Sequence, residues 1–236
     1  MHVESFSDAC TVKFARMCTQ AKLHTQRRGP TYKFGILLPT DQNHALRIDK
    51  DNDDHLWELS IGSEMDQIAE YNTFRNMGRG AKPPRDHQRI RVHLVFDVKH
   101  DLRRKSWLVA GGHMTAPPKD SVYSGVATLR SLRLCMFLGE LNGLDVDTAD
   151  VGNAYLMAFT KEKLFIIAGP EFEDLQGCLL IIIKALYGLR TSGARWHEFF
   201  ADTLMDMGYY PCKADPDVWM KDSGTHYEFV CVYVDD

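Results

Sequence analysis

The chain has 236 residues, of which 44% are hydrophobic and 25% charged, and its formal net charge is −4. These values are those of an ordinary globular protein that buries a real core, as one domain or two small lobes. The longest apolar runs, 178–183 and 229–234, are far too short to cross a bilayer, which excludes a membrane-spanning chain. No signal-peptide pattern opens the sequence, and six cysteines without CxxC spacing favour reduced, mostly buried thiols over disulfides or zinc.

The charges are distributed unevenly along the chain. Between residues 75 and 105, ten Lys and Arg residues are opposed by only three Asp residues, whereas acids dominate 49–54 and 145–150. Such a separation suits a protein that holds phosphates with one part and metal ions with another. A solvated charged face is the simpler interpretation of the charge pattern alone, so this pattern leaves nucleic-acid binding open.

The first part of the chain shows one clear helical pattern. Residues 1–45 lack sustained periodicity and are predicted to form a weakly structured leader. From residue 53 to residue 68, apolar side chains recur every three or four positions, with Asp53 or Asp54 as the N-cap. This spacing predicts an amphipathic helix.

A hairpin and a series of helices and strands follow. Alternation over 90–98 predicts a half-buried strand, which the charged turn 99–104 connects to a second apolar run at 107–110. The later predicted elements are, in chain order, a helix over 122–142, a strand over 144–149 that ends at Asp150, strands at 163–167 and 179–184, a helix from Thr191 or Ser192 to Gly208, and a hairpin of 218–221 and 227–234.

Carboxylates follow two of these predicted strands. Asp150 opens the motif Asp-Val-Gly-Asn-Ala-Tyr, in which Gly152 permits a tight turn. The N–H groups of 151–154 would then point outward, where they can hold phosphate oxygens. The last apolar strand delivers the adjacent Asp235 and Asp236.

Carboxylates in such positions suit nucleotidyl transfer. This reaction moves charge onto an attacking 3′-oxygen and a leaving pyrophosphate, and two Mg²⁺ ions about 4 Å apart stabilise both. Mg²⁺ prefers a few carboxylates together with phosphate oxygens and water. One Asp from each of two neighbouring strands would meet this need. An Asp-Asp pair by itself is more often solvated, so Asp235 and Asp236 gain meaning only together with Asp150.

The combined motifs resemble those of reverse transcriptases, and in particular the Ty1/copia retrotransposon branch. The sequence around Asp150 is similar to the family's first catalytic motif, and Tyr233-Val-Asp-Asp236 is similar to its second. The matches run in the family's order from about residue 34 to the end of the chain. The matches typical of the Ty1/copia branch are Trp57 with Glu64-Met65, Leu108-Val-Ala-Gly-Gly112, Lys184-Ala-Leu-Tyr-Gly-Leu-Arg190, Ala194-Arg195-Trp196, and Lys213-Ala-Asp-Pro216 before Val218-Trp219.

The resemblance implies an α+β fold, the right-hand polymerase with fingers and palm. An antiparallel palm sheet would pack on helices, and the thumb would be absent. The implied division of the chain is a leader at 1–45, fingers at 46–125, palm at 126–156, fingers again at 157–190, and a truncated palm at 191–236.

The same resemblance assigns the chemistry to three carboxylates. Asp150, Asp235 and Asp236 match the catalytic and metal-binding residues, with Asp236 as the weaker contributor. The backbone carbonyl of Val151 is the further implied ligand. The implied cofactor is a pair of Mg²⁺ ions, for which Mn²⁺ can substitute.

A nucleotide pocket is also implied. Tyr155 would stack under the incoming sugar and exclude a 2′-hydroxyl. The backbone N–H groups of Gly152-Asn153-Ala154 would hold the triphosphate, and Lys105 with Arg104 would supply cations from the fingers hairpin. The residues alone leave two alternatives open, namely a core aromatic for Tyr155 and a solvated hairpin tip for the two cations.

Further residues are implied to contact the template or the primer. Gly188 would leave room beneath the template base because it has no side chain, although it can also serve only as a turn between strand and helix. The implied contacts are Tyr187, Gly188 and Arg190 on the side of the template or nucleotide, and Tyr233 and Val234 near the primer end.

Three features depart from the family pattern. Trp107 stands where an Arg usually precedes Leu-Val-Ala, which removes a cation from the nucleotide-facing hairpin. Thr191-Ser192-Gly193 replaces the usual Gln-Ala-Pro and changes the start of the helix near the template. No strand, RNase H motif or integrase motif follows Asp236, so we expect little polymerase activity from the isolated chain.

The function that the resemblance implies is an RNA-directed DNA polymerase domain of a Ty1/copia-like retrotransposon polyprotein. The implied partners are an RNA template, a DNA primer strand, the RNA–DNA hybrid, dNTPs and the rest of the Pol polyprotein, namely thumb, RNase H and integrase; no membrane partner is expected. The implied location is intracellular, in the cytoplasm and within virus-like particles. Two alternatives remain open, namely an inactive retroelement relic and a remnant whose basic fingers bind nucleic acid without chemistry.

Overall fold

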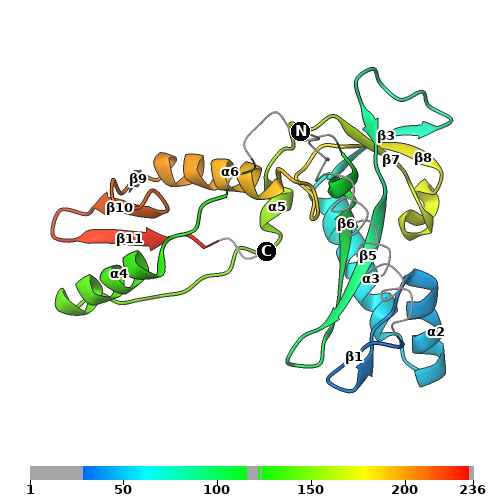
Figure 1. Ribbon diagram of the computed structural model, residues 1–236, viewed down its shortest axis with the longest axis horizontal. Helices are drawn as coiled ribbons and strands as arrows, with labels where there is room; N and C mark the ends of the chain where they lie inside the picture. The colour runs from blue at the N-terminus through cyan, green and yellow to red at the C-terminus, as the bar shows by residue number, and fades with distance from the viewer. Residues whose placement is uncertain (1–28, 116–121, 123, 234–236) are drawn as a thin grey trace, which may run out of the picture.

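Two lobes make up the part of the chain that the computed structural model describes, which is residues 29–115, 122 and 124–233. The first lobe contains residues 29–115 and 159–190, and the second contains 124–158 and 191–233 (Figure 1). Both lobes mix helices with strands, so the predicted α+β composition is confirmed. No helix in these ranges is both long and apolar enough to cross a membrane.

The first lobe combines a long hairpin with a four-stranded sheet. Its elements are, in chain order, β1 (Tyr32–Lys33), β2 (Ile36–Leu37), α2 (Gln42–Asn52), α3 (Leu56–Glu70), β3 (Phe74–Arg79), β4 (Gln88–Arg89), β5 (Val92–Val98), β6 (Arg104–Ala110), η1 (Gly112–Met114), β7 (Leu164–Ile167), η2 (Pro170–Leu175) and β8 (Cys178–Ile182). Strands β5 and β6 form the antiparallel hairpin, and the sheet has the order β3-β8-β7-β4.

Alternating side chains fix the hairpin on helix α3. Phe96, Val98 and Leu108 point to one face of the hairpin and are buried. The ring of Trp57, on α3, meets the ring of Phe96 edge to face with centroids 5.6 Å apart. Helix α2 packs against the same cluster through buried Ala45. The opposite face of the hairpin is therefore left for other contacts.

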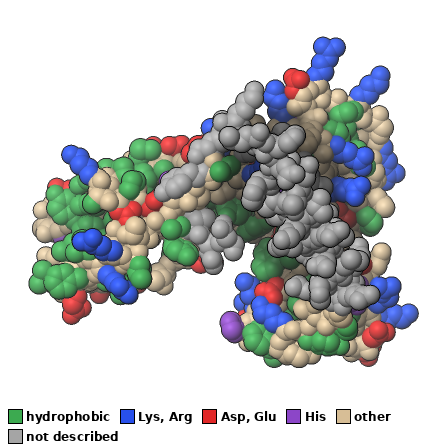
Figure 2. Space-filling view, viewed as in Figure 1, with side chains coloured by type: hydrophobic (Ala, Val, Ile, Leu, Met, Phe, Trp, Pro, Cys, Tyr) green, Lys and Arg blue, Asp and Glu red, His purple; other side chains and the backbone are tan. Residues whose placement is uncertain are grey.

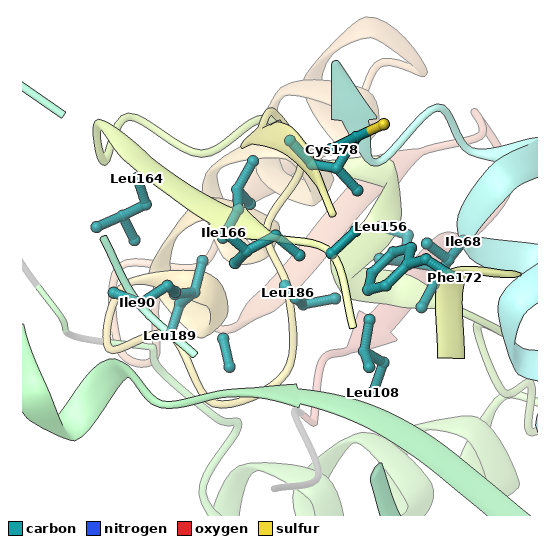
Figure 3. Close-up of a cluster of buried hydrophobic side chains, with 14 residues drawn as sticks. Ile68, Ile90, Leu108, Leu156, Leu164, Ile166, Phe172, Cys178, Leu186 and Leu189 are labelled. Carbon is teal, nitrogen blue, oxygen red and sulfur yellow. The ribbon is translucent and has the colours of Figure 1, made fainter. Parts of the chain in front are cut away.

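The four-stranded sheet lies in the larger core of the protein. Strands β7 and β8 are nearly continuous apolar runs, as expected for strands covered on both faces. Figure 3 shows Leu164 and Ile166 of β7 in one cluster with Leu156, Leu186 and Leu189, which belong to the segments that lead into and out of the second lobe. The core thus extends to the boundary between the lobes.

The second lobe packs a small sheet against helices. Its elements are α4 (Leu129–Leu141), α5 (Ala154–Met157), α6 (Ser192–Asp206), β9 (Tyr210–Pro211), β10 (Val218–Asp222) and β11 (Tyr227–Cys231). The antiparallel sheet has the order β11-β10-β9. Trp196 and Leu204 of α6 are buried with Trp219 of β10, and the Trp196 ring stacks on Phe200 with centroids 4.8 Å apart.

The segment 184–190, here called the joint, connects the lobes through main-chain contacts. The Ala110 N–H at the end of β6 donates to the Tyr187 carbonyl at 2.7 Å, and the Ala185 N–H donates to the Ala158 carbonyl at 2.9 Å. Gly188 has a φ of +85°, and a Cβ added to it would lie 2.2 Å from the Ala110 carbonyl oxygen. Only glycine fits this position without moving the backbone.

Most of the elements predicted from periodicity are confirmed. They are the hairpin at 90–110, the strands at 163–167 and 179–184, the helix that starts at 191 or 192, and the final hairpin as far as residue 231. The final hairpin was predicted to continue to residue 234. Tyr233 is described but is not in a strand, and Val234 lies outside the described residues.

The predicted weakly structured leader is wrong for residues 32–45. Strands β1 and β2 pair there, and helix α2 begins after Asp41, whose side chain accepts a hydrogen bond from the His44 N–H at 2.9 Å. The sequence pattern was weak because α2 buries only three residues. Residues 1–28 lie outside the described part of the chain.

Two aspartates serve the N-terminus of helix α3, and one of them was not predicted. Buried Asp49 accepts hydrogen bonds from the N–H groups of Trp57 at 3.1 Å and Glu58 at 2.8 Å, across the turn from α2. Asp54 accepts a longer bond from the Leu56 N–H at 3.3 Å. Asp49 was missed because it precedes Trp57 by eight residues, which is farther than a helix-capping pattern extends.

Two predictions at the start of the second lobe are wrong. Helix α4 begins at 129 rather than 122, because the Thr128 side chain caps it and the preceding Ala127 N–H donates to the Val232 carbonyl at 2.8 Å. Residues 144–149 form no strand. Their side chains are mostly exposed, and they pair with no strand among the described residues.

We expect Gly188→Ala to lower the free energy of unfolding by about 2–4 kcal/mol. About 1–2 kcal/mol is the cost of a left-handed backbone for a residue with Cβ, and overpacking against Ala110 adds at least about 1 kcal/mol. Gly177→Ala is the matched control, because Gly177 has a φ of +81° and open space around its Cβ position. Urea unfolding of both variants measures the difference; equal losses would contradict the close contact at the joint.

Candidate active site

Asp150 lies where an exposed segment turns into the core of the second lobe. Its side chain is exposed, whereas the next residue, Val151, packs against the cluster around Trp196. Asn153 adopts a left-handed φ of 54° and leads into α5. The tight turn expected at Gly152 is therefore made by Asn153, a residue type that tolerates this conformation better than most.

Two tyrosines stand next to this turn. Tyr155, on α5, and Tyr187, on the joint, have ring centroids 5.0 Å apart at an angle of 60°. Burial raises the pKa of Tyr187, and the nearby charges of Glu64 and Asp150 raise this pKa further because they oppose a phenolate. The structure thus brings together Asp150, both tyrosines and a carboxylate from helix α3.

The hairpin β5–β6 supplies cations on the other side. The Lys105 ammonium lies 3.8 Å from Glu64 Oε2, in a partly buried pair. The Arg104 guanidinium lies 5.6 Å from the Trp57 ring centroid and donates to the Leu102 carbonyl at 2.7 Å. Both predicted triphosphate-binding cations are therefore near the site, but Arg104 is held by its own hairpin.

A cleft of about 1810 Å³ separates these two groups of residues. Its first-lobe wall carries four cations, Lys99, Arg103, Arg104 and Lys105. Its second-lobe wall carries four carboxylates, Asp145, Asp147, Asp150 and Glu228. Figure 2 shows Lys and Arg side chains on both lobes, with more of them on the first. A cleft divided in this way suits a polyanion that reaches metal ions on one side.

The last strand leads toward this cleft. The Val232 N–H donates to the Asp217 carbonyl at 3.0 Å, which anchors the chain just before the predicted catalytic pair. Tyr233 lines the cleft with 71% of its surface exposed. Val234, Asp235 and Asp236 lie outside the described residues, and among those described no group of three or more His, Cys, Asp or Glu side chains is arranged to hold a metal ion.

The three residues predicted to contact the template or the nucleotide, Tyr187, Gly188 and Arg190, belong to the joint, where Gly188 and Arg190 make close contacts. Gly188 packs against the backbone of β6, which explains its lack of a side chain without any ligand. Arg190 donates from Nε to the Gly112 carbonyl at 3.1 Å and from Nη2 to the His113 carbonyl at 2.9 Å. The structure gives both residues a structural role.

Glu64 is a site residue that sequence reasoning did not assign. It is 4% exposed, and its Oε1 accepts a hydrogen bond from the Leu108 N–H at 3.0 Å. Burial raises the pKa of Glu64, while this bond and Lys105 lower it in part. The sequence did contain a signal for Glu64, because it places a charged residue in the apolar stripe of α3. Carboxylates are rarely buried without a partner, so such a position indicates a specific contact.

The motif at 213–216 is structural in the described chain. Asp215 Oδ2 accepts a hydrogen bond from the Thr128 N–H at 2.9 Å, and the Ser131 hydroxyl and this N–H hold the pKa of Asp215 below its ordinary value. His197 Nε2 lies 2.5 Å from Asp217 Oδ1. These contacts tie α4 and α6 to β10 and so position the end of β11.

The fold and the cleft define a two-lobed α+β protein whose cleft carries cations on one wall and carboxylates on the other. The chain belongs to the reverse transcriptase (RNA-dependent DNA polymerase) family, whose sequence model matches residues 74–236. It is 24% identical over 230 residues to the "Retrovirus-related Pol polyprotein from transposon RE1" of Arabidopsis thaliana, a match that covers 93% of this chain and 15% of the relative.

Two other relatives carry similar names. The Pol polyprotein from transposon RE2 of Arabidopsis thaliana is 23% identical over 93% of this chain and 16% of its own length. That from transposon TNT 1-94 of Nicotiana tabacum is 25% identical over 75% of this chain and 14% of its own length. The chain thus spans about 15% of the curated relatives that it matches, and the resemblance to the Ty1/copia branch is confirmed. No solved structure gives a significant match.

We expect Glu64→Gln to flatten the pH dependence of stability. Because the folded-state pKa of Glu64 is raised, the folded chain binds the proton more tightly than the unfolded chain. The wild-type free energy of unfolding should therefore fall as pH rises from the ordinary carboxyl pKa to the raised one, and glutamine should remove this fall while it keeps an acceptor for Leu108. Urea unfolding across this pH range is the measurement, with exposed Glu58→Gln as the control; identical slopes in wild type and Glu64→Gln would contradict the assignment.

Proposed function

We propose that this chain is the fingers-and-palm part of an RNA-directed DNA polymerase. The single observation that carries the proposal is the cleft in which the cations of the β5–β6 hairpin face Asp150 and the tyrosine pair. In this assignment the first lobe is the fingers and the second lobe is the palm. The expected substrates are an RNA template, a DNA primer and dNTPs, and the expected further partners are the remaining parts of a Pol polyprotein.

The residues fit a divalent metal ion of the hard, oxygen-binding type. Asp150 offers an exposed carboxylate at the cleft, and the chain next to Tyr233 continues into Asp235 and Asp236. Carboxylates with few competing nitrogen or sulfur donors suit Mg²⁺, and Mn²⁺ as a substitute. The three Asp carboxylates and the carbonyl of Val151 would hold two such ions. The ions would stabilise the charge on the attacking and leaving oxygens of nucleotidyl transfer.

The protein's own residues would orient the nucleotide. Lys105 would pair with the triphosphate, because its present partner Glu64 is 3.8 Å away and leaves part of the ammonium free for another anion. The N–H groups of 152–154 would add hydrogen bonds. Tyr155 would pack under the sugar, with Tyr187 behind it to hold the ring. These contacts would fix the α-phosphate for in-line attack, the step for which orientation matters most.

Nucleic acid would run through the cleft beside this pocket. We assign the primer end to Tyr233 and Val234, and the template side to Tyr187, Gly188 and Arg190. The exposure of Tyr233 supports its part of the assignment. The bonds of Arg190 to the 112–113 carbonyls support an indirect role, in which Arg190 positions the joint rather than touching the template.

A second function, nucleic-acid binding without chemistry, is favoured by one observation. Further cations lie outside the cleft on the first lobe, at Arg75, Arg79, Arg85 and Arg89, where they can hold phosphates but cannot reach the reacting atoms. An inactive relic would share this binding. Catalysis and binding are therefore tested separately.

We expect Asp150→Asn to lower Mg²⁺-dependent primer extension on an RNA template by at least about 100-fold, because it removes a charged metal ligand at the reacting phosphate. Asp147→Asn is the control, since Asp147 is an exposed carboxylate on the same cleft wall. Extension should be measured with this chain and with one that continues past Asp236, and binding of an RNA–DNA hybrid should be measured in parallel. Full extension by Asp150→Asn would refute the catalytic assignment; unchanged hybrid binding without extension in any wild-type chain would favour the binding function.

We expect Tyr155→Ala to relax discrimination against ribonucleotides by about 10- to 100-fold, because the ring would no longer occupy the space of a 2′-hydroxyl. Tyr155→Phe keeps the ring and should keep the discrimination. Single-nucleotide incorporation with paired dNTP and rNTP measures the ratio of kcat/KM values. A ratio that stays the same in Tyr155→Ala would leave Tyr155 as a packing residue only.

A further inference from the structure

Trp107 differs from the other three tryptophans of the chain. Trp57, Trp196 and Trp219 are buried, with 1%, 5% and 4% of their surfaces exposed. Trp107 lies on β6, is only partly buried, and lines the cleft. A large aromatic ring that faces a cleft in this way is a common anchor for ligands.

The packing of the hairpin does not require this ring. The register pairs Trp107 with Val95, which is 38% exposed, and strand alternation puts both on the face opposite to Phe96 and Leu108. The face that carries Phe96 and Leu108 is the one packed on helix α3. Trp107 therefore lies on the outer face of the hairpin.

Cations surround the ring. The ammonium groups of Lys99 and Lys105 lie 5.4 Å and 5.8 Å from its centroid. Toward the hairpin tip, Arg103 and Arg104 line the same cleft. At about 3.3 Å per strand residue, this row of cations extends about 13 Å from Trp107. A row of this length matches the backbone of successive nucleotides better than one compact triphosphate.

An aromatic face with cations beside it is the combination that binds single-stranded nucleic acid. The ring stacks on an unpaired base, and the cations pair with the neighbouring phosphates. A protein partner would also find an aromatic anchor here, but four adjacent cations in a cleft favour a polyanion. Duplex bases are stacked on each other and cannot offer a free face to the ring.

We propose that Trp107, with Lys99 and Lys105 beside it, is a stacking platform for an unpaired base of a single-stranded nucleic acid. The proposal rests on the proposed function only in that it requires nucleic acid in the cleft; it requires no catalysis. The proposal gives a binding role to Trp107, which stands where the family pattern has an Arg. The ring would hold the strand by stacking rather than by charge.

The test is equilibrium binding of the whole chain to a labelled single-stranded oligothymidylate, followed by fluorescence anisotropy. We expect Trp107→Ala to weaken binding about 5- to 100-fold and to leave the salt dependence unchanged, since stacking releases no counterions. Trp107→Phe should retain most of the affinity. Lys105→Gln should instead lower the slope of log K against log salt by about one unit. Val95→Ala, the exposed cross-strand neighbour, is the matched control and should bind as wild type.

Tryptophan fluorescence gives a second, direct measurement. The strand should quench the emission of the wild-type chain and shield it from iodide, and both effects should vanish in Trp107→Phe because the remaining tryptophans are buried. Matched duplex and dTTP should give much weaker quenching than the oligonucleotide at equal nucleotide concentration. Far-UV circular dichroism and thermal melting show that each variant is folded.

The outcomes separate this proposal from the proposed function. Equal affinities of wild type and Trp107→Ala for the strand, both folded, would overturn the platform and leave nucleic-acid binding intact. Equal quenching by dTTP would overturn the assignment to a strand in favour of a free nucleotide. Absence of binding to any nucleic acid would contradict the proposed function itself, together with the platform.

Discussion

The main-chain contact between the joint and the end of β6 is the constraint on which the rest of the structure depends. The Ala110 N–H binds the Tyr187 carbonyl, and Gly188 lies against the Ala110 carbonyl with no room for a side chain. Backbone contacts of this kind fix position more tightly than side-chain contacts, because they involve no rotamer freedom. The contact holds Tyr187 beside Tyr155 and places the base of the hairpin, at Val109, on the cleft that Asp150 also lines. The distance across the cleft follows from it.

One buried carboxylate, that of Glu64, lies beside the cations of the β5–β6 hairpin. Glu64 is the one carboxylate of α3 that is buried behind the cationic hairpin, where it holds β6 through Leu108 and restrains Lys105. The Glu64 carboxylate thus offsets part of the charge of Lys105 on the first-lobe wall. Three of the four acids on the second-lobe wall, Asp145, Asp147 and Asp150, are exposed to water.

The sequence allowed prediction of the elements with strong periodicity and of the family through motif order, but not of contacts made between distant segments. The hairpin β5–β6 and helix α6 follow from alternation and helical spacing, which are local. The role of Asp49 at helix α3, the left-handed turn at Asn153 rather than Gly152, and the buried position of Glu64 depend on tertiary packing. The strand expected at 144–149 was wrong because a short apolar alternation forms a strand only where a partner strand is available. Motif residues such as Gly188 and Asp215 were noticed correctly, but the structure gives them structural roles.

The path of the chain between the lobes has a consequence for synthesis on the ribosome. Strand β3 pairs with β8, and Phe74 lies opposite Ile182, although the whole first part of the second lobe is made between them. At a synthesis rate of about 5–20 residues per second, β8 is made on the order of 10 s after β3. During that interval the edge of β3 that later pairs with β8 is uncovered, so nascent chains are exposed to wrong pairing and to chaperones. The first lobe cannot be completed before much of the second has emerged.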